Sequence, residues 1–140
     1  MTAIVLDTHV AIWLVQGDTQ LSAGAVQFIE TAARERPAAI AAISIWEIGM
    51  LAAKGRLQLG KDVQEWVEDL LALPGLRLAP LEPSTAVASS RLPGVMHGDP
   101  ADRILAATAR HLDATLVTAD EKLLAYGAAG YLKVRDARAD

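Results

Sequence analysis

The chain has 140 residues, 52% of them hydrophobic, which predicts a single domain over residues 1–140 and excludes a disordered chain. It contains no cysteine, which excludes disulfides, thiolate zinc sites and cysteine nucleophiles and fits a reducing cytoplasm, where we expect the protein to act. The formal net charge of −4 argues weakly against a nucleic-acid partner, because such proteins usually carry a basic surplus.

The chain alternates between short apolar runs and longer amphipathic stretches. In chain order we expect a strand at 3–6, helices at 8–16 and 22–34, a strand at 39–43, helices at 44–54 and 62–73, a strand at 76–79, a helix at 84–91, a helix from 99 onward, a strand at 115–118, a helix at 120–126 and an edge strand at 131–134. The last six residues are expected to be frayed. No apolar run approaches a membrane span and no signal peptide is visible, so we expect no membrane partner.

Strands that alternate with helices predict βαβ units, and therefore an α/β fold with a mostly parallel sheet. In open sheets of this kind, ligands bind beyond the carboxyl ends of the strands. Three acidic residues, Asp7, Glu47 and Asp120, lie at or just past such ends, and Asp102 lies in the first turn of a helix. We therefore expect a shared site there, although none of these residues is a neighbour of another in the sequence.

Each acidic residue also has an ordinary structural interpretation as a helix cap, and the sequence leaves both interpretations open. Ser44 and Glu47 have the spacing of a capping box, and Asp99 and Asp102 fit the N-cap and an acidic first turn. Asp120 could be a further N-cap. Asp7 is the least comfortable as a cap, because Thr8 could cap the following helix itself.

Taken together, the carboxylates predict a divalent-cation site, with Asp99 as a fifth and secondary ligand. Oxygen ligands without cysteine favour Mg²⁺ or Mn²⁺ over zinc, and closely spaced carboxylates cannot all ionise unless a cation offsets them. Seventeen acidic residues less these five leave twelve, against thirteen lysines and arginines, so the rest of the chain is about neutral.

Other polar and aromatic residues carry weaker signals. The three tryptophans, Trp13, Trp46 and Trp66, could stack on bases, but we expect them in the core because they lie at helical spacing beside aliphatic residues. His97 is expected as a surface loop residue, although it could touch substrate near Asp99. Phosphate-binding loops, dinucleotide glycine fingerprints and serine-hydrolase elbows are absent from the sequence.

The chain resembles the PIN-domain family, most of all the VapC-type toxins of bacterial toxin–antitoxin pairs. The resemblance covers nearly the whole chain in the right order. Its motifs are Leu6-Asp-Thr-His-Val-Ala-Ile-Trp13, Ser44-Ile-Trp-Glu-Ile48 with Lys54-Gly-Arg-Leu57, His97-Gly-Asp-Pro-Ala-Asp-Arg-Ile-Leu-Ala-Ala-Thr-Ala109 and Leu116-Val-Thr-Ala-Asp120.

This resemblance implies a three-layer α/β/α sandwich and a metal-dependent ribonuclease. Its acidic site would consist of Asp7, Glu47, Asp102 and Asp120, with Asp7, Asp102 and Asp99 on the metal. Supporting hydroxyls would be Thr8, Ser44 and Thr118, and Arg103 and Lys54 could meet RNA phosphates. The family also implies a homodimer and a VapB-type antitoxin that lays a tail across the cleft and presents a basic side chain to the carboxylates.

Two alternatives come from other functional classes. An acidic, cation-binding regulatory module of the receiver type would need a phospho-accepting aspartate at a middle strand end, and residues 39–45 offer none. A metal-dependent phosphatase with Asp7 as nucleophile would usually want a second aspartate two residues on, where this chain has His9.

Overall fold

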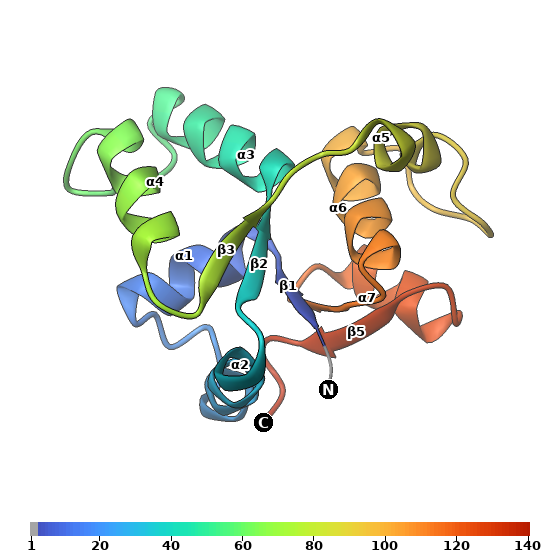
Figure 1. Cartoon of the computed structure of the whole chain (residues 1–140), viewed down its shortest axis with the longest axis horizontal. Coiled ribbons are helices and arrows are strands. Elements are labelled where there is room, and N and C mark those ends of the chain that lie inside the picture. Colours follow the sequence, from blue (N-terminus) through green and yellow to red (C-terminus); the bar gives the residue numbers. More distant parts are fainter. Residues whose placement is uncertain (1–2) are drawn as a thin grey trace.

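The computed structural model describes residues 3–140, so the first two residues of the predicted domain lie outside the described part. Its centre is a five-stranded sheet with the strand order β3-β2-β1-β4-β5, and every paired neighbour runs parallel (Figure 1). The strands are β1 (Ile4–Leu6), β2 (Ala38–Ala41), β3 (Leu76–Ala79), β4 (Thr115–Thr118) and β5 (Lys133–Asp136). This confirms the predicted parallel α/β sheet.

Seven helices of the described chain surround the sheet, as the strand connections require. They are α1 (Thr8–Gln16), α2 (Ala23–Glu35), α3 (Ala42–Ala53), α4 (Val63–Ala72), α5 (Pro83–Ser89), α6 (Pro100–His111) and α7 (Glu121–Ala128). Helices α1 and α2 pack on one face, and α6 and α7 on the other. The three-layer α/β/α sandwich is therefore confirmed, and none of these helices is long and apolar enough to cross a membrane.

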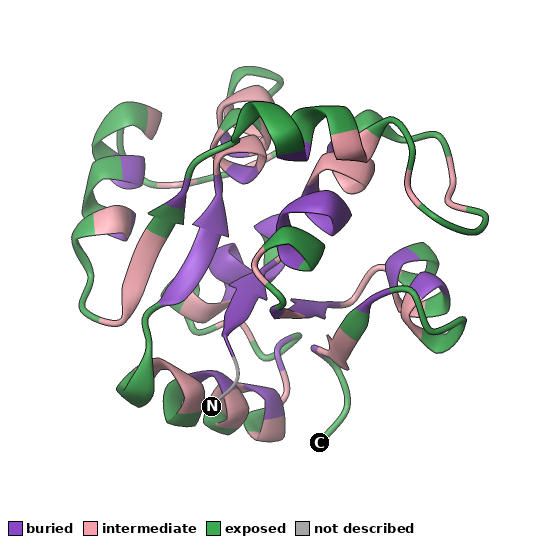
Figure 2. Ribbon diagram, turned by 45° about the vertical axis from the view of Figure 1, so that its right-hand side comes forward, coloured by how far each residue is buried: buried purple, intermediate pink, exposed green. Residues whose placement is uncertain are grey.

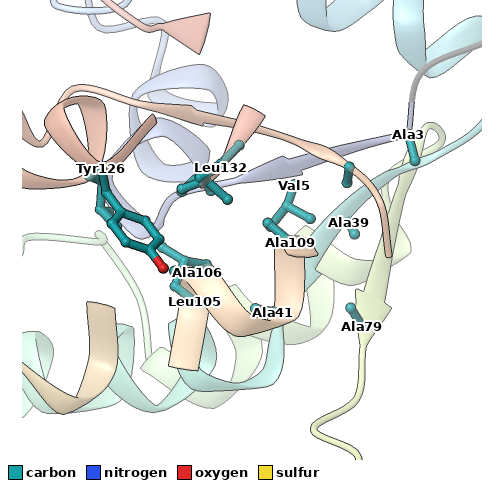
Figure 3. Close-up of a cluster of buried hydrophobic side chains, with 13 residues drawn as sticks. Ala3, Val5, Ala39, Ala41, Ala79, Leu105, Ala106, Ala109, Tyr126 and Leu132 are labelled. Atoms are coloured by element: carbon teal, nitrogen blue, oxygen red, sulfur yellow. The ribbon is translucent and has the colours of Figure 1, made fainter. Parts of the chain in front are cut away.

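Alternate residues of the strands supply the two cores, because successive side chains point to opposite faces of a sheet. On one face, Val5 and Leu116 pack with Leu105 of α6 and Tyr126 of α7 (Figure 3). On the other, Ile4, Leu6, Ile40 and Val117 pack against α1 and α2. A third, smaller cluster joins α1, α3 and α4 through Ile12, Ile48 and Trp66. Burial is therefore concentrated in the central strands β1, β2 and β4 and on the inner faces of the helices (Figure 2).

Helix α3 begins earlier than predicted, and this changes the role of Ser44. Strand β2 ends at Ala41, which is also the N-cap, and no side chain caps the helix. The predicted strand at 39–43 therefore runs two residues too far, and the capping box of Ser44 and Glu47 is wrong. Ser44 lies inside the helix and is fully buried, so its hydroxyl is free to serve a tertiary contact.

The C-terminal residues are docked, which corrects the prediction that the last six are frayed. Strand β5 extends through Asp136, two residues past the predicted edge strand. Ala137 is fully buried; its N–H donates to the carbonyl of Thr118 (2.8 Å) and its carbonyl accepts from Ser22 N (2.9 Å). Ser22 Oγ also donates to the carbonyl of Ala139 (2.8 Å).

We expect Ser22→Ala to lower the free energy of unfolding by about 1–2 kcal/mol, because it removes both the N-cap of α2 and the bond to the C-terminal turn. Urea denaturation followed by circular dichroism measures this change. The control is Thr31→Ala on the exposed side of the same helix, which should be near neutral. Equal stability of Ser22→Ala and wild type would contradict the docked turn.

Candidate active site

The carboxyl edge of the sheet carries a cleft of about 500 Å³ that brings together all five predicted acidic residues. Its acidic lining residues come from segments that are far apart in the sequence, as expected for the edge where parallel strands end. The residues that line it are Asp7, His9, Trp13, Gln20, Glu47, Asp99, Asp102, Ala119, Asp120 and Arg138.

Asp7 is fixed by hydrogen bonds to both carboxylate oxygens. It follows β1 directly and is the N-cap of α1, where Oδ1 accepts from Thr8 N (2.7 Å). Oδ2 accepts from the hydroxyl of Thr118 at the end of β4 (2.6 Å). The same hydroxyl accepts from Asp120 N (3.0 Å), so Thr118 ties two acidic segments together. The predicted supporting residue Thr118 therefore contacts Asp7, and the cap and cleft interpretations of Asp7 hold together.

Glu47 is held by a chain of buried hydroxyls. Thr8 Oγ1 lies 2.7 Å from Glu47 Oε1 and 2.9 Å from Ser44 Oγ. A hydroxyl has one hydrogen, so Thr8 donates to the carboxylate and accepts from Ser44. Thr8 is thus not the N-cap of α1; its backbone N–H binds Asp7, while its side chain reaches across to α3.

Asp99 and Asp102 occupy the first turn of α6. Asp99 is the N-cap, as predicted, and its Oδ1 accepts from Asp102 N (3.1 Å). The Asp102 side chain points toward His97, and its Oδ2 lies 2.8 Å from His97 Nε2. His97 lies in the predicted loop, but its side chain is only 17% exposed, so it is not a freely exposed surface residue. Its position five residues before Asp102 was the available sequence signal.

Asp120 also combines two roles. It is the N-cap of α7, where Oδ1 accepts from Lys122 N (2.8 Å) and Leu123 N (3.0 Å). It also lines the cleft with Asp7 and Asp102. The helix N-terminus stabilises its negative charge, which lets an acidic side chain stand next to others of the same sign.

Burial and mutual repulsion make three of these carboxyls weaker acids than usual. Burial is the main reason that the pKa of Asp7 is raised, and the negative charge of Asp102 adds to it. The pKa of Glu47 is raised by burial and then by its acidic neighbours, against the hydrogen bond from Thr8. The pKa of Asp102 is raised by burial and by Asp99 and Asp120, although His97 opposes the shift. A cation in the cleft would relieve this repulsion.

The donor set fits a hard cation, since it consists of carboxylate oxygens. Within residues 3–140, however, no three Asp, Glu or His side chains already surround one point closely enough to hold an ion. The carboxylates line the cleft, each engaged in its own hydrogen bond. Metal binding by Asp7, Asp102 and Asp99 therefore stays a prediction.

The two basic residues predicted to meet phosphates do not line the cleft. Arg103 donates through Nε to the carbonyl of Ser89 (2.9 Å) and through Nη1 to the carbonyls of Met96 (3.1 Å) and His97 (3.4 Å). It fastens the loop that carries His97 to α6, so the geometry gives no support to a phosphate contact. Lys54 is exposed at the C-cap of α3.

Trp46 departs from the core prediction, whereas Trp13 and Trp66 are buried as expected. Its side chain is 54% exposed and lines an apolar hollow of about 410 Å³ between α3 and α6. Glu47 and Asp99 line both this hollow and the acidic cleft, so the two lie side by side.

The cleft is also lined by three residues that the sequence did not predict there, Arg138, Gln20 and His9. Arg138 was hidden by the expectation of a frayed terminus, and only the docked C-terminal turn brings it to the cleft. His9 does carry a signal, because it lies two residues after Asp7 at the start of a helix.

Comparison with known proteins agrees with this geometry. The PIN domain family model matches residues 4–129. The chain belongs to the PIN-domain family. Ribonuclease VapC22 of Mycobacterium tuberculosis is 40% identical over 123 residues, which cover 88% of this chain and 91% of that protein. The predicted family and its likeness to VapC-type proteins are thereby confirmed, and PIN-domain ribonucleases generally depend on a divalent metal.

Solved toxin–antitoxin structures share the fold of this PIN domain. The VapBC2 complex of Rickettsia felis, bound to a promoter DNA fragment, matches with a TM-score of 0.68 at 16% identity over 95% of this chain and 97% of that one. FitAcB of Neisseria gonorrhoeae matches with a TM-score of 0.66 at 22% identity over 95% and 96%. At these identities the likeness shows the PIN fold alone.

We expect Thr8→Val to lower the free energy of unfolding by about 1–3 kcal/mol, because it leaves Ser44 and Glu47 without their shared partner. Thr8→Ser keeps the hydroxyl and should lose much less. Chemical denaturation of both variants measures the difference. Equal destabilisation by valine and serine would show that packing, and not the hydrogen bond, matters at this position.

We expect Asp7→Asn to raise the melting temperature of the metal-free fold at pH 8, because it removes a buried carboxylate whose ionisation opposes folding. The raised pKa of Asp7 means that ionisation weakens the folded state as the pH rises through that pKa. Below the ordinary value of 3.8 the carboxyl is protonated in both states, so the gain should vanish there.

Thermal unfolding from pH 3.5 to 8, in the presence of a chelator, tests this linkage. Glu30→Gln, an exposed acid on α2, is the matched control and should change little. A gain that is the same at both ends of the pH range would contradict the assigned cause.

Proposed function

We propose that this PIN domain is a divalent-metal-dependent endoribonuclease and the toxin of a toxin–antitoxin pair. The observation that carries the proposal is the convergence of five acidic residues on one cleft, two of them held by buried threonine hydroxyls. The 40% identity to a protein named as a ribonuclease supports the choice of RNA as substrate.

Asp7 and Asp102, with Asp99 beside them, are the residues proposed to hold Mg²⁺ or Mn²⁺. Asp7 is the best placed of the three, because Thr118 and the start of α1 fix both of its oxygens. When bound, such an ion polarises a phosphoryl oxygen and lowers the pKa of a bound water.

The remaining carboxylates are proposed to prepare the nucleophile. Glu47 is held by Thr8 with one oxygen, which leaves the other to orient a water or complete the cation cage. Asp120, which caps α7 and lines the cleft, is proposed to share in orienting this water or completing the cage. The hydrogen bond between Ser44 and Thr8 fixes the orientation of the Thr8 hydroxyl. The direction of the Glu47 side chain is therefore determined by buried hydrogen bonds and not by solvent.

The proposed partners are RNA, a VapB-type antitoxin and a second copy of the chain in a homodimer. The solved structures of similar fold include VapBC and FitAB complexes, which supports an antitoxin partner. An acidic cleft is also a suitable receptor for a basic side chain of such a partner.

No contact in the described residues favours the receiver-type or phosphatase alternatives. Strand β2 ends at Ala41 without an aspartate, and His9 stands two residues after Asp7 as an exposed imidazole at the rim of the cleft.

We expect Asp7→Asn to reduce RNA cleavage by at least about 10³-fold while leaving the fold intact, because it removes the best-fixed carboxylate. Cleavage of total RNA is mapped for wild type and variant with Mn²⁺, with Mg²⁺ and with a chelator. Glu30→Gln should cut like wild type.

Full cleavage by folded Asp7→Asn, or cleavage that persists in excess chelator, would refute the proposed role of this site. Circular dichroism and thermal unfolding establish that the variant is folded. Expression of wild type with and without a neighbouring antitoxin gene tests the toxin role separately.

A further inference from the structure

Arg138 lies at the acidic cleft because the C-terminal turn is anchored on both sides of it. Before it, the backbone of Ala137 bonds to Thr118 and Ser22. After it, the carbonyl of Ala139 accepts from Ser22 Oγ and from Arg135 Nη1, both at 2.8 Å. The N–H of Arg138 itself donates to Asp136 Oδ1 (2.9 Å). The backbone of this residue is therefore fixed at the edge of the sheet.

The side chain of Arg138 has a fixed platform as well. Its guanidinium carbon lies 5.5 Å from the centre of the Trp13 ring, within the range of a cation–π contact. Trp13 is only 8% exposed and belongs to the core against α2, so it is a rigid surface. The flexible arginine is thus held over the rim of the cleft.

Arg138 is unpaired although it lies among carboxylates. Of the described residues that line the cleft, it is the one lysine or arginine. Within residues 3–140, no Asp or Glu oxygen lies within 4.0 Å of its guanidinium nitrogens. A residue that served only to neutralise the acids would contact one of them. The planar guanidinium instead keeps its hydrogen-bond donors available for an anion that enters the cleft.

We infer that Arg138 is a substrate-binding residue that donates to a non-bridging oxygen of an RNA phosphate at the acidic cleft. Guanidinium and phosphate match in geometry and form charge-assisted hydrogen bonds. The inference rests on the proposed function, which supplies the anion. It also gives the cleft a positive group for the phosphate beside the negative groups for the cation. Trp13 is the positioning residue that holds the guanidinium.

RNA binding separates this contact from catalysis. The probe is a short, fluorescently labelled single-stranded RNA, and affinity is measured by anisotropy in the Asp7→Asn background, where cleavage is not expected. Adding Arg138→Ala should weaken binding at least about tenfold and lower the slope of log affinity against log salt by about 0.7. Arg138→Lys should retain part of the affinity, because it keeps the charge without the fork of donors.

The matched control is Arg34→Ala. Arg34 is an exposed arginine in the last turn of α2, next to the start of β2 and therefore at the opposite edge of the sheet. The Arg34→Ala substitution removes the same charge from the protein and should leave RNA affinity nearly unchanged. Single neutral methylphosphonate linkages, placed in turn along the RNA, identify the contacted phosphate. At one position the neutral linkage should weaken RNA binding by the protein that retains Arg138. The same linkage should not further weaken binding by the Arg138→Ala variant.

Unchanged affinity of folded Arg138→Ala, an equal loss in Arg34→Ala, or a neutral-linkage effect that is the same with and without Arg138 would each overturn the inference. Wild-type cleavage with Mn²⁺ is measured in parallel. If wild type cleaves RNA but Arg138→Ala does not change RNA affinity, only this contact is refuted. RNA binding that depends on Arg138 without any cleavage refutes the proposed ribonuclease and leaves the contact standing.

Discussion

The acidic cleft depends on hydrogen bonds that two buried threonines donate to carboxylates. Thr118 holds Asp7, and Thr8 holds Glu47 with the support of Ser44. These hydroxyls join β4 to the end of β1, and α1 to α3. Without them, acidic side chains with raised pKa values would turn outward to solvent, because both burial and mutual repulsion oppose their ionised forms. The fold thus holds like charges together before any cation is present.

That arrangement explains why the chain can be acidic overall and still be suited to a polyanion. The negative charge is concentrated where a cation is expected, and several of the carboxylates also cap helices, whose N-termini stabilise them. A residue can both cap a helix and line the cleft, because helices such as α1 and α7, which start just beyond parallel strands, place their caps at the carboxyl edge of the sheet. The docked arginine over Trp13 adds a positive group to the same edge.

Much of the fold could be predicted because its signals are local. The helix at 8–16 and the strand at 115–118 are found where their apolar patterns place them, and Asp99 and Asp120 cap their helices as the sequence allowed. The failures have a common physical cause. Ser44, Trp46 and Arg138 were misjudged because a partner distant in the sequence, or the lack of one, decides their place. A serine at capping-box spacing and a terminal turn look the same locally whether or not such a partner exists.

By itself, the sequence determined the order of strands and helices along the chain and the positions of Asp7, Asp99 and Asp120 at helix starts, because periodicity and capping act over a few residues. Glu47 instead lies inside α3, six residues after β2 ends. Only the tertiary structure decided which donor holds each carboxylate, that Trp46 faces a hollow beside the cleft, and that Arg103 fastens a loop while Arg138 reaches the site. The physical reason is that hydrogen bonds such as Thr118 to Asp7 and Ala137 to Thr118 join residues that only the assembled parallel sheet brings within bonding distance.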